Sequence, residues 1–583
     1  MSFGFVEKDC AYSVLNTART VAYKATSEEL INSGPIIFDN LPTTAGDNVL
    51  NINSATGVVS RTPFPVPNEP YTGTTWGQYL YYSPAAANFV TGGASITLGN
   101  NAGLTLQGTS AVALGGGAGQ TGQGTQSVAI GADSGALLQG TNAVAMGPTA
   151  GQASQGSEAV AIGFGAGTTY QGAASVAVGP VAGQFFQREN SVAIGSSAGR
   201  TAQGTQSVAI GVASGQFSQG NFAVAIGVSA GSEFQGFNSI AIGNQAGLQV
   251  QEPNAIAIGV LSGQQSQGNS CVAIGNSAGQ TQQGNQSVAI GFTSGFSSQG
   301  ANCVAVGTLS GSSSQGYGSV AIGSAAGNNS QGLESVAIGL SAGQNNQASY
   351  GIAIGPNAGF QSQGGSAIAI GNLSGTISQG FNSVAVGFYA GNTGQQSEAV
   401  CIGVNAGQNN QGLRGVAIGA GAAFVSQGSD SVAIGYLAGA SSQAANTVIL
   451  NASGAALNSV AASGFYVQPV RAVAGGVAML WNAATGEVSI APSQRATKNT
   501  IVDLADDTSV VFGLQARNFI YNADENKEVH VGYIAEEVEE LNRKLAIHNT
   551  VDGPPVNINY NVVLVFLVEE VRKLRAQVDA LLR

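Results

Sequence analysis

Ser127-Val128-Ala129-Ile130-Gly131 is the stretch that decides the fold, because close variants of it return every 16 residues. The last position of the segment falls at residues 99, 115, 131, 147 and so on to 451, which makes 23 copies without an insertion. A fixed period of this kind is typical of repeat architectures in which each unit stacks on its neighbours. The chain is therefore predicted to form a solenoid of 16-residue coils.

Each copy contains a short strand whose two large aliphatic residues are two positions apart, as Val128 and Ile130 are. Because alternate side chains of a strand share a face, we expect this pair to fill the interior of the coil. The residue between them is Ala in 20 of 23 copies, with Thr97, Cys401 and Ile449 as the exceptions, and is then expected to point outward. A small outward side chain predicts close packing against another chain, and we expect three copies to meet along these alanine rows.

Two further positions repeat in step with the strand. Gly follows four residues after the strand end in 21 of 23 copies, as at Gly135, and predicts a turn that needs a positive φ or a close backbone approach. Gln occupies the eighth position in 22 successive copies, from Gln107 through Gln443. Amides stacked about 4.8 Å apart can hydrogen-bond along the solenoid as a ladder, and 23 such coils predict a shaft of roughly 110 Å.

The repeated strand resembles the SVAIG-like strand of trimeric adhesin heads of the YadA type, although the period is longer here. This resemblance covers about residues 94–455 and implies a trimeric, left-handed, parallel β-roll. The fold class is thus expected to be an all-β repeat solenoid, followed by a C-terminal α+β domain that ends in a coiled-coil helix.

Four regions are expected along the chain. Residues 1–93 lack the period and are predicted to form an N-terminal cap or attachment domain, with a helix from about Ala11 to Ile31. The shaft occupies residues 94–455, a connector with a β-hairpin residues 456–492, and a separate domain residues 493–583. The connector segment 482–489 echoes segment 53–60, and both predict tight hairpins.

Composition excludes several classes of protein. The chain has 86 glycines and only 8% charged residues, and its formal net charge of −12 comes with no basic tract, so nucleic acid is not an expected partner. The start lacks the pattern of a secretion signal and no apolar run predicts a membrane helix, so we expect a chain made in the cytosol without membrane insertion. The four cysteines (Cys10, Cys271, Cys303 and Cys401) match neither a disulfide framework nor a zinc pattern and are expected to be buried free thiols. No cofactor or metal is expected.

Catalytic motifs in the shaft arise from its turn composition. Gly275 to Gly279 fits a nucleophile elbow and Gly117 to Gly122 fits GxGxxG, yet residues 99–451 contain no His or Lys and only 11 charged residues in 353. The acidic residues lie at least one coil apart, so no glycosidase pair is expected. Aromatic residues at loop positions either pack over neighbouring loops or stack on sugars or protein: Phe185, Phe186, Phe217, Phe234, Phe388 and Tyr389.

The composition changes at Ser493, after which 24 of the last 91 residues are charged. The segment Ser493-Gln494-Arg495-Ala496-Thr497-Lys498-Asn499-Thr500-Ile501 resembles the S-D-x-R-x-K-x-N-I signature that opens the intramolecular chaperone domains of phage endosialidase tailspikes, peptidase family S74. Segments 519–522 and 530–538 and the helix that follows Tyr560 match the same family in order, while Gln494 replaces its usual acid.

The resemblance implies that the chain cleaves its own Pro492-Ser493 bond once the trimer has formed. Ser493 would be the nucleophile and Lys498 the base, which must be neutral and therefore desolvated. His530 is expected to be structural and not a third catalytic group. Six residues of the last helix alternate at spacings of three and four and predict a coiled-coil seam that gathers three chains: Leu564, Leu567, Val571, Leu574, Val578 and Leu581.

The chain is accordingly interpreted as a homotrimeric virion fibre or tail-fibre protein, assembled in the host cytoplasm and located in the virion. Its expected partners are the virion or tail structure and a host-surface receptor, with a glycan among the candidates. The alternatives are a bacterial trimeric adhesin-like surface protein, a tailspike enzyme, and a structural spacer that retains its trimerisation cap. An ice-binding solenoid would need outward threonine rows, whereas the outward residue expected here is alanine.

Overall fold

The structure is a computed structural model that describes residues 77–83, 86, 88–471, 479–482, 485–490, 495–522, 527–548 and 552–583, together with four N-terminal strands. The chain divides into two compact units, Met1–Pro469 and Val470–Arg583.

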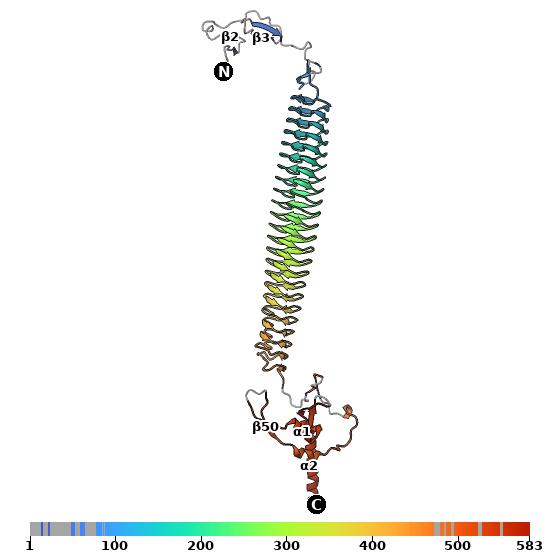
Figure 1. The fold of residues 1–583 in the computed structure, drawn as a ribbon, viewed down its shortest axis with the longest axis vertical. Coiled ribbons are helices and arrows are strands. Elements are labelled where there is room, and N and C mark those ends of the chain that lie inside the picture. Colours follow the sequence, from blue (N-terminus) through green and yellow to red (C-terminus); the bar gives the residue numbers. More distant parts are fainter. Residues whose placement is uncertain are drawn as a thin grey trace. The chain divides into compact units, whose positions relative to one another are not determined.

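The first unit is a parallel β-solenoid of about 23 turns. Its first sheet begins with β7 (Ile96–Leu98), β8 (Val112–Leu114) and β10 (Val128–Ile130), and each strand pairs in parallel with the strand 16 residues later. Figure 1 shows these strands stacked coil upon coil. The sheet runs one strand past the last repeat, because β46 (Val448–Asn451) pairs with β47 (Phe465–Gln468).

A second parallel strand in most coils begins nine residues after the start of the first. These strands form one sheet from β9 (Thr121–Gln123) to β21 (Phe217–Gln219) and another from β25 (Gln265–Gln267) to β39 (Ile377–Gln379). A final pair consists of β42 (Asn409–Gln411) and β44 (Val425–Gln427). Isolated bridges from Gln219 to Gln267 connect the two longer sheets.

The expected orientation of the first strand is wrong. Ala129, expected to point outward, is completely buried inside the coil, whereas Val128 and Ile130 lie on the outer surface and are only partly covered. The interior is narrow, since it is filled by the small residues of the strand and turn and by the glutamine amides of the second strand. Alanine therefore occupies this position because a larger side chain does not fit between the two sheets.

Each coil turns with residues in the left-handed region. Gly131 has φ +122°, and a Cβ there would lie 2.7 Å from the backbone of Gly147 in the next coil. Gly135 has φ +53°, and a Cβ there would lie 2.9 Å from the amide of Gln139. The two repeated glycines thus meet both needs predicted from sequence, a positive φ and a close backbone approach.

The predicted glutamine ladder is confirmed. Nε2 of Gln347 donates to Val336 O across the coil at 2.9 Å, to Gly351 O at 3.1 Å and to Oε1 of Gln363 in the next coil at 2.9 Å. The amides are buried in the coil interior, where such bonds satisfy groups that water cannot reach. The ladder is interrupted at some coils, and Oε1 of Gln187, Gln203 and Gln219 has no hydrogen-bond partner there.

Larger residues close the two ends of the solenoid. Ile449 takes the place of the interior alanine in the last repeat, and Leu457 and Tyr466 pack against its cluster. At the other end, the hydroxyl of Tyr79 donates to Ser95 O and accepts from Thr97 N, both at 2.8 Å. These side chains cover the interior where no further coil follows.

The segment before the solenoid contains strands where a helix was expected. β1 (Ser13–Leu15) and β2 (Val21–Tyr23) pair antiparallel, so the helix predicted from Ala11 to Ile31 is wrong over these residues. β3 (Asn48–Ile52) and β4 (Val59–Pro63) form the hairpin predicted around residues 53–60. β5 (Leu80–Ser83) and β6 (Asn88–Thr91) form a further hairpin.

The second unit is a small α+β assembly. The predicted hairpin around residues 482–489 consists of β48 (Met479–Asn482) and β49 (Glu487–Ile490). The short helices η1 (Arg495–Thr497) and η2 (Thr508–Gly513) follow, and then β50 (Arg517–Phe519) pairs antiparallel with β51 (His530–Gly532). Next come α1 (Ala535–Leu541), η3 (Arg543–Leu545), the antiparallel pair β52 (Ala546–His548) and β53 (Pro555–Ile558), and α2 (Tyr560–Leu581).

One apolar cluster holds the second unit together. It joins η2, α1, η3, β53 and α2 through Val511, Val538, Leu545, Ile558 and Phe566. The side chain of Asn559 caps α2 by accepting from Val562 N at 3.3 Å. The N-terminal half of α2 thus belongs to the core of the unit, while the half beyond residue 571 is exposed throughout.

Candidate functional site

The outer surface of the first sheet carries two parallel rows of aliphatic side chains, which we call the aliphatic face. In each coil from β8 to β46 the strand contributes one residue to each row, such as Val128 and Ile130. The second-row residues are up to about two-fifths exposed, for example Ile194 at 39% and Ile402 at 40%. A soluble monomer rarely exposes so continuous an apolar surface.

The size of the aliphatic face can be estimated from strand geometry. The rows lie about 7 Å apart and repeat every 4.8 Å, so a surface on the order of 1,000 Å² is presented along the solenoid. The largest apolar patch of an ordinary monomer is roughly 300–600 Å². An area of this size is what a specific protein interface requires. The aliphatic face is therefore larger than the apolar patch that an ordinary monomer exposes.

The catalytic pair predicted from sequence is only partly visible. Ser493 and Pro492 lie outside the described residues, so the distance from Ser493 to Lys498 is not defined. Lys498 follows η1, and its side chain is exposed beside Asn499 and Thr500. A Ser-Lys mechanism requires a desolvated lysine, whereas Lys498 is exposed in the described part of the chain.

Three of the C-terminal segments that carry the sequence resemblance meet in space. Phe519 of β50 stacks on His530 of β51 at a ring distance of 6.0 Å, and Tyr521 lies 5.0 Å from the same imidazole. A Cβ added to Gly532 would lie 3.2 Å from the Phe519 ring and 3.7 Å from the hydroxyl of Tyr560. His530 thus belongs to a cluster of three rings with Phe519 and Tyr521.

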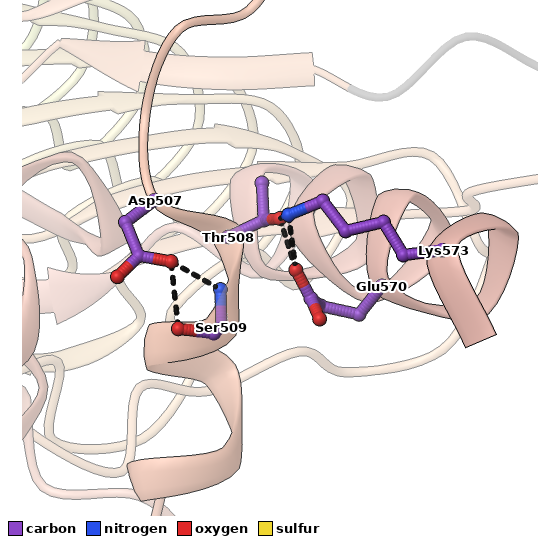
Figure 2. A network of polar contacts seen from close by, with 5 residues as sticks. All are labelled: Asp507, Thr508, Ser509, Glu570 and Lys573. Atoms are coloured by element: carbon purple, nitrogen blue, oxygen red, sulfur yellow. Dashed lines mark hydrogen bonds and ion pairs between the residues drawn. The ribbon is translucent and has the colours of Figure 1, made fainter. Parts of the chain in front are cut away.

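A polar network that sequence analysis did not identify fixes η2 against α2 (Figure 2). Nζ of Lys573 donates to Oε1 of Glu570 and to Oγ1 of Thr508, both at 2.6 Å, and the Thr508 hydroxyl donates to the same carboxylate oxygen. Thr508 and Glu570 are buried. The hydrogen bonds from Lys573 and then Thr508 lower the pKa of Glu570 below its usual value. The i,i+3 pair on α2 is visible in the sequence, but its partner Thr508 is 62 residues away from Glu570.

A second set of hydrogen bonds, also drawn in Figure 2, caps the N-terminal end of η2. Asp507 caps η2 by accepting from Ser509 N at 3.0 Å and from the Ser509 hydroxyl at 2.6 Å, which lowers the pKa of Asp507. The two sets of bonds occupy adjacent residues of one short helix. Together they form a structural clamp, because the hydroxyls of Thr508 and Ser509 each donate to a carboxylate.

The residues of the predicted coiled-coil seam are exposed along α2. The exposed fractions of the six side chains are 58% for Leu564, 45% for Leu567, 56% for Val571, 48% for Leu574, 49% for Val578 and 86% for Leu581. They occupy one helical stripe because their spacing alternates between three and four. The seam is thus an apolar stripe of α2 that is exposed in the described part of the chain.

The cysteines of the shaft are structural. Cys271 and Cys303 replace the serine that precedes the strand, and their thiols donate to Gly284 O at 2.7 Å and Gly316 O at 2.8 Å as Ser287 does to Gly300 O. Cys401 replaces the interior alanine. The three thiols are free and buried, as predicted, and burial raises the pKa of each. Cys10 lies outside the described residues.

No metal-binding group of three or more His, Cys, Asp or Glu is present within the described part of the chain. Ser277, the serine of the apparent nucleophile elbow, donates instead to the side chain of Asn276 at 3.0 Å. The motif therefore describes a turn of the solenoid.

Comparisons with protein-family models, with curated proteins and with solved structures found no match to this chain. None of the described helices is both long and apolar enough to cross a membrane. The resemblances to adhesin heads and to S74 chaperone domains therefore remain predictions from the sequence. The fold and its exposed apolar surfaces are the structural evidence that bears on function.

Proposed function

We propose that this protein is a homotrimeric fibre that displays its solenoid as an attachment shaft, and that residues 493–583 serve as its trimerisation and chaperone domain. A β-solenoid of about 23 turns is compatible with a fibre or adhesin-like structural protein. The observation that carries the proposal is the aliphatic face, which extends along the shaft and is uncovered in one chain.

Burial of the aliphatic face supports association of copies of the chain. Each copy presents the same rows at the same spacing, so parallel copies can bury these side chains coil by coil. Burial of apolar surface stabilises an assembly by about 25 cal/mol per Å². Over the whole aliphatic face, roughly 1,000 Å², this free energy is far larger than the part that one coil supplies. The partner surface is therefore the aliphatic rows, in place of the alanine rows expected from sequence.

The seam of α2 supports association at the C-terminal end. Parallel coiled coils with Val at position a and Leu at position d often have two strands, and here Val571 and Leu574 follow that pattern. We propose three chains, and not two, because of the resemblances to trimeric adhesin heads and to S74 chaperone domains. The native mass of the assembly distinguishes two chains from three.

The virion role comes from the same C-terminal resemblance. Uniform coils can pair almost equally well one coil out of register, and a domain that aligns the chains before the shafts associate removes that ambiguity. A bacterial adhesin-like surface protein remains the second candidate, since the solenoid is equally compatible with it. Fractionation of virions and of cell envelopes separates the two.

The proposal is tested by placing charge on the aliphatic face of the full chain. One triple variant carries Glu at outward positions of three successive coils, and the matched control carries Glu on the second strand of the same coils. The first variant changes Ile258, Ile274 and Ile290, and the control changes Ser266, Gln282 and Ser298, which are exposed. We expect a trimeric native mass for wild type and control, and a lower mass for the first variant with unchanged circular dichroism.

Two results would contradict the proposal. A monomeric native mass for the wild-type protein would contradict the proposed assembly of a fibre. A trimeric wild type whose mass survives the three glutamates shows that the chains associate elsewhere.

A further inference from the structure

A groove of about 570 Å³ is lined by residues of five successive coils and lies over the second strands of four of them, away from the sheet that carries the aliphatic face. One wall is formed by the middle residues of these strands: Leu138, Ser154, Tyr170 and Phe186. The floor contains Gly156 and Gly172, and Arg188, Glu189 and Thr205 line the groove at its C-terminal end.

Two aromatic rings stand side by side in this wall. Tyr170 is 62% exposed and Phe186 is 56% exposed, and their ring centres lie 6.3 Å apart with planes tilted by 40°. Each ring contacts the other across neighbouring coils, yet more than half of each side chain still meets solvent. Adjacent exposed rings provide flat apolar surfaces at the spacing of the coils.

The repeat position of these rings differs along the shaft. In the twelve coils from residue 266 to residue 442 this position holds only Ser, Gln, Asn or Gly. In the ten coils from residue 106 to residue 250 it also holds Ala, Leu, Tyr, Phe and Val. The coil therefore folds with serine at this position, and an aromatic residue is not required there for the fold.

Two of the few charged residues of the shaft lie in this groove. The shaft has 11 charged residues in 353, yet Arg188 and Glu189 are adjacent, both exposed and both in the groove. Arg188 also replaces the glycine found at its repeat position in 17 of 22 coils. The groove thus combines exposed ring faces with hydrogen-bonding groups at one end.

The backbone of the groove floor is already engaged. Gly156 N donates to Gln171 O at 2.7 Å and Gly172 N donates to Gln187 O at 2.8 Å, as part of the stacking between coils. An extended peptide therefore finds no strand edge to pair with here. Binding must instead use side chains and flat surfaces, and the negative charge of the chain disfavours a nucleic acid.

We propose that this groove binds an oligosaccharide. The C–H-rich face of a pyranose ring carries partial positive charge and packs on the negative face of an aromatic ring, here Tyr170 or Phe186. Sugar hydroxyls can then accept from the Arg188 guanidinium and donate to the Glu189 carboxylate. This inference rests on the proposed attachment function and gives it a ligand class and a location.

The test measures binding of the labelled full-length protein to a glycan array, followed by titration of the best ligand. The double variant Tyr170→Ser and Phe186→Ser carries the residue that other coils have at this position. The matched control is Phe234→Ser, which alters an equally exposed aromatic at the same repeat position outside the groove. Loss of the two aromatic ring faces should weaken binding at least about tenfold in the double variant. The control should bind like wild type, and Arg188→Gly should weaken binding with the coil intact.

The inference is overturned if the wild type binds no glycan, if the double variant binds as tightly as wild type, or if Phe234→Ser loses as much affinity. The native mass of every protein is measured in parallel. A trimer that binds no glycan rejects this inference alone, whereas a monomer that binds through Tyr170 and Phe186 rejects the trimeric fibre and retains the groove.

Discussion

The interior alanine sets the width of each coil. Ala129 and its equivalents are fully buried, and the larger Val128 and Ile130 are displaced to the outside. This arrangement inverts the usual preference for large aliphatic residues in a core. It follows that the stability of one coil depends less on hydrophobic burial than on its amide ladder and its backbone hydrogen bonds.

The importance of the ladder can be tested at two glutamines with different bonding. Replacement of Gln347 with Leu removes donors to Val336 O, Gly351 O and the next amide. Replacement of Gln203 removes one bond, to Val192 O, because the ladder is already interrupted there. Each buried group left without a partner costs roughly 1–3 kcal/mol. We therefore expect Gln347→Leu to lower the free energy of unfolding more than Gln203→Leu in denaturant titrations, and equal losses would contradict the role of the ladder.

The buried thiols give a prediction about reactivity. Burial raises the pKa of Cys271, Cys303 and Cys401, so the reactive thiolate is scarce at neutral pH. In a Cys10→Ser variant we expect no labelling of the native protein by iodoacetamide at pH 8, and labelling of three thiols after unfolding. Mass spectrometry of both samples makes the comparison, and rapid labelling of the native protein would show that the coil interior opens.

At the scale of the element, the short helix η2 and the long helix α2 are joined by a buried carboxylate. Glu570 receives the Thr508 hydroxyl and the Lys573 ammonium, while the apolar cluster packs around Phe566. A buried carboxylate of this kind is tolerated because its charge is paired and hydrogen-bonded. The clamp therefore makes the position of η2 dependent on the ionisation of one group.

The sign of the pH dependence follows from the lowered pKa of Glu570. Its contribution to stability is present above the pKa of the unfolded chain, about 4.3, and is lost as the pH falls through the lower pKa of the folded state. Hydrogen exchange of the full chain should show η2 and the middle of α2 losing protection as the pH falls below about 4. Glu570→Gln should lower protection at pH 7 and reduce this acid sensitivity, and an unchanged acid response in that variant would assign it to Asp507 or other carboxylates.

At the scale of the whole molecule, the proposed chaperone domain predicts a self-processing step. If Ser493 attacks the preceding carbonyl, the 583-residue chain yields fragments of residues 1–492 and 493–583. Lys498 is exposed in the single chain, so we expect cleavage to require assembly, which can bury that lysine. Denaturing gels and intact mass of wild type, Ser493→Ala and Lys498→Ala provide the measurement.

Three outcomes are distinguishable in that experiment. Fragments from wild type alone support the pair, with the trimer as the cleaving species. An intact trimer of wild type shows a retained trimerisation cap and rejects autoproteolysis. Cleavage in all three proteins assigns the event to another protease.

The sequence predicted those features that depend on period and local pattern. The strict repeat predicted the stacked coils and the ladder of Gln107 to Gln443, and the turn residues predicted both hairpins. It did not predict the direction of Ala129, because alternation shows which residues share a face but not which face is inside. That choice depends on the width of the closed coil. Nor could the sequence show the contact of Thr508 with Glu570, which depends on how a distant segment folds back on α2.

The equivalence of the coils also affects how the gene that encodes the shaft can change. Each coil contacts only the coils before and after it, and every such contact repeats after 16 residues. A recombination event that removes or duplicates one whole unit therefore leaves every remaining neighbour with the partner it needs, while any other insertion breaks the stack. Shaft length can thus change in discrete steps between related genes, and reach becomes a trait that selection can adjust without inventing a new fold.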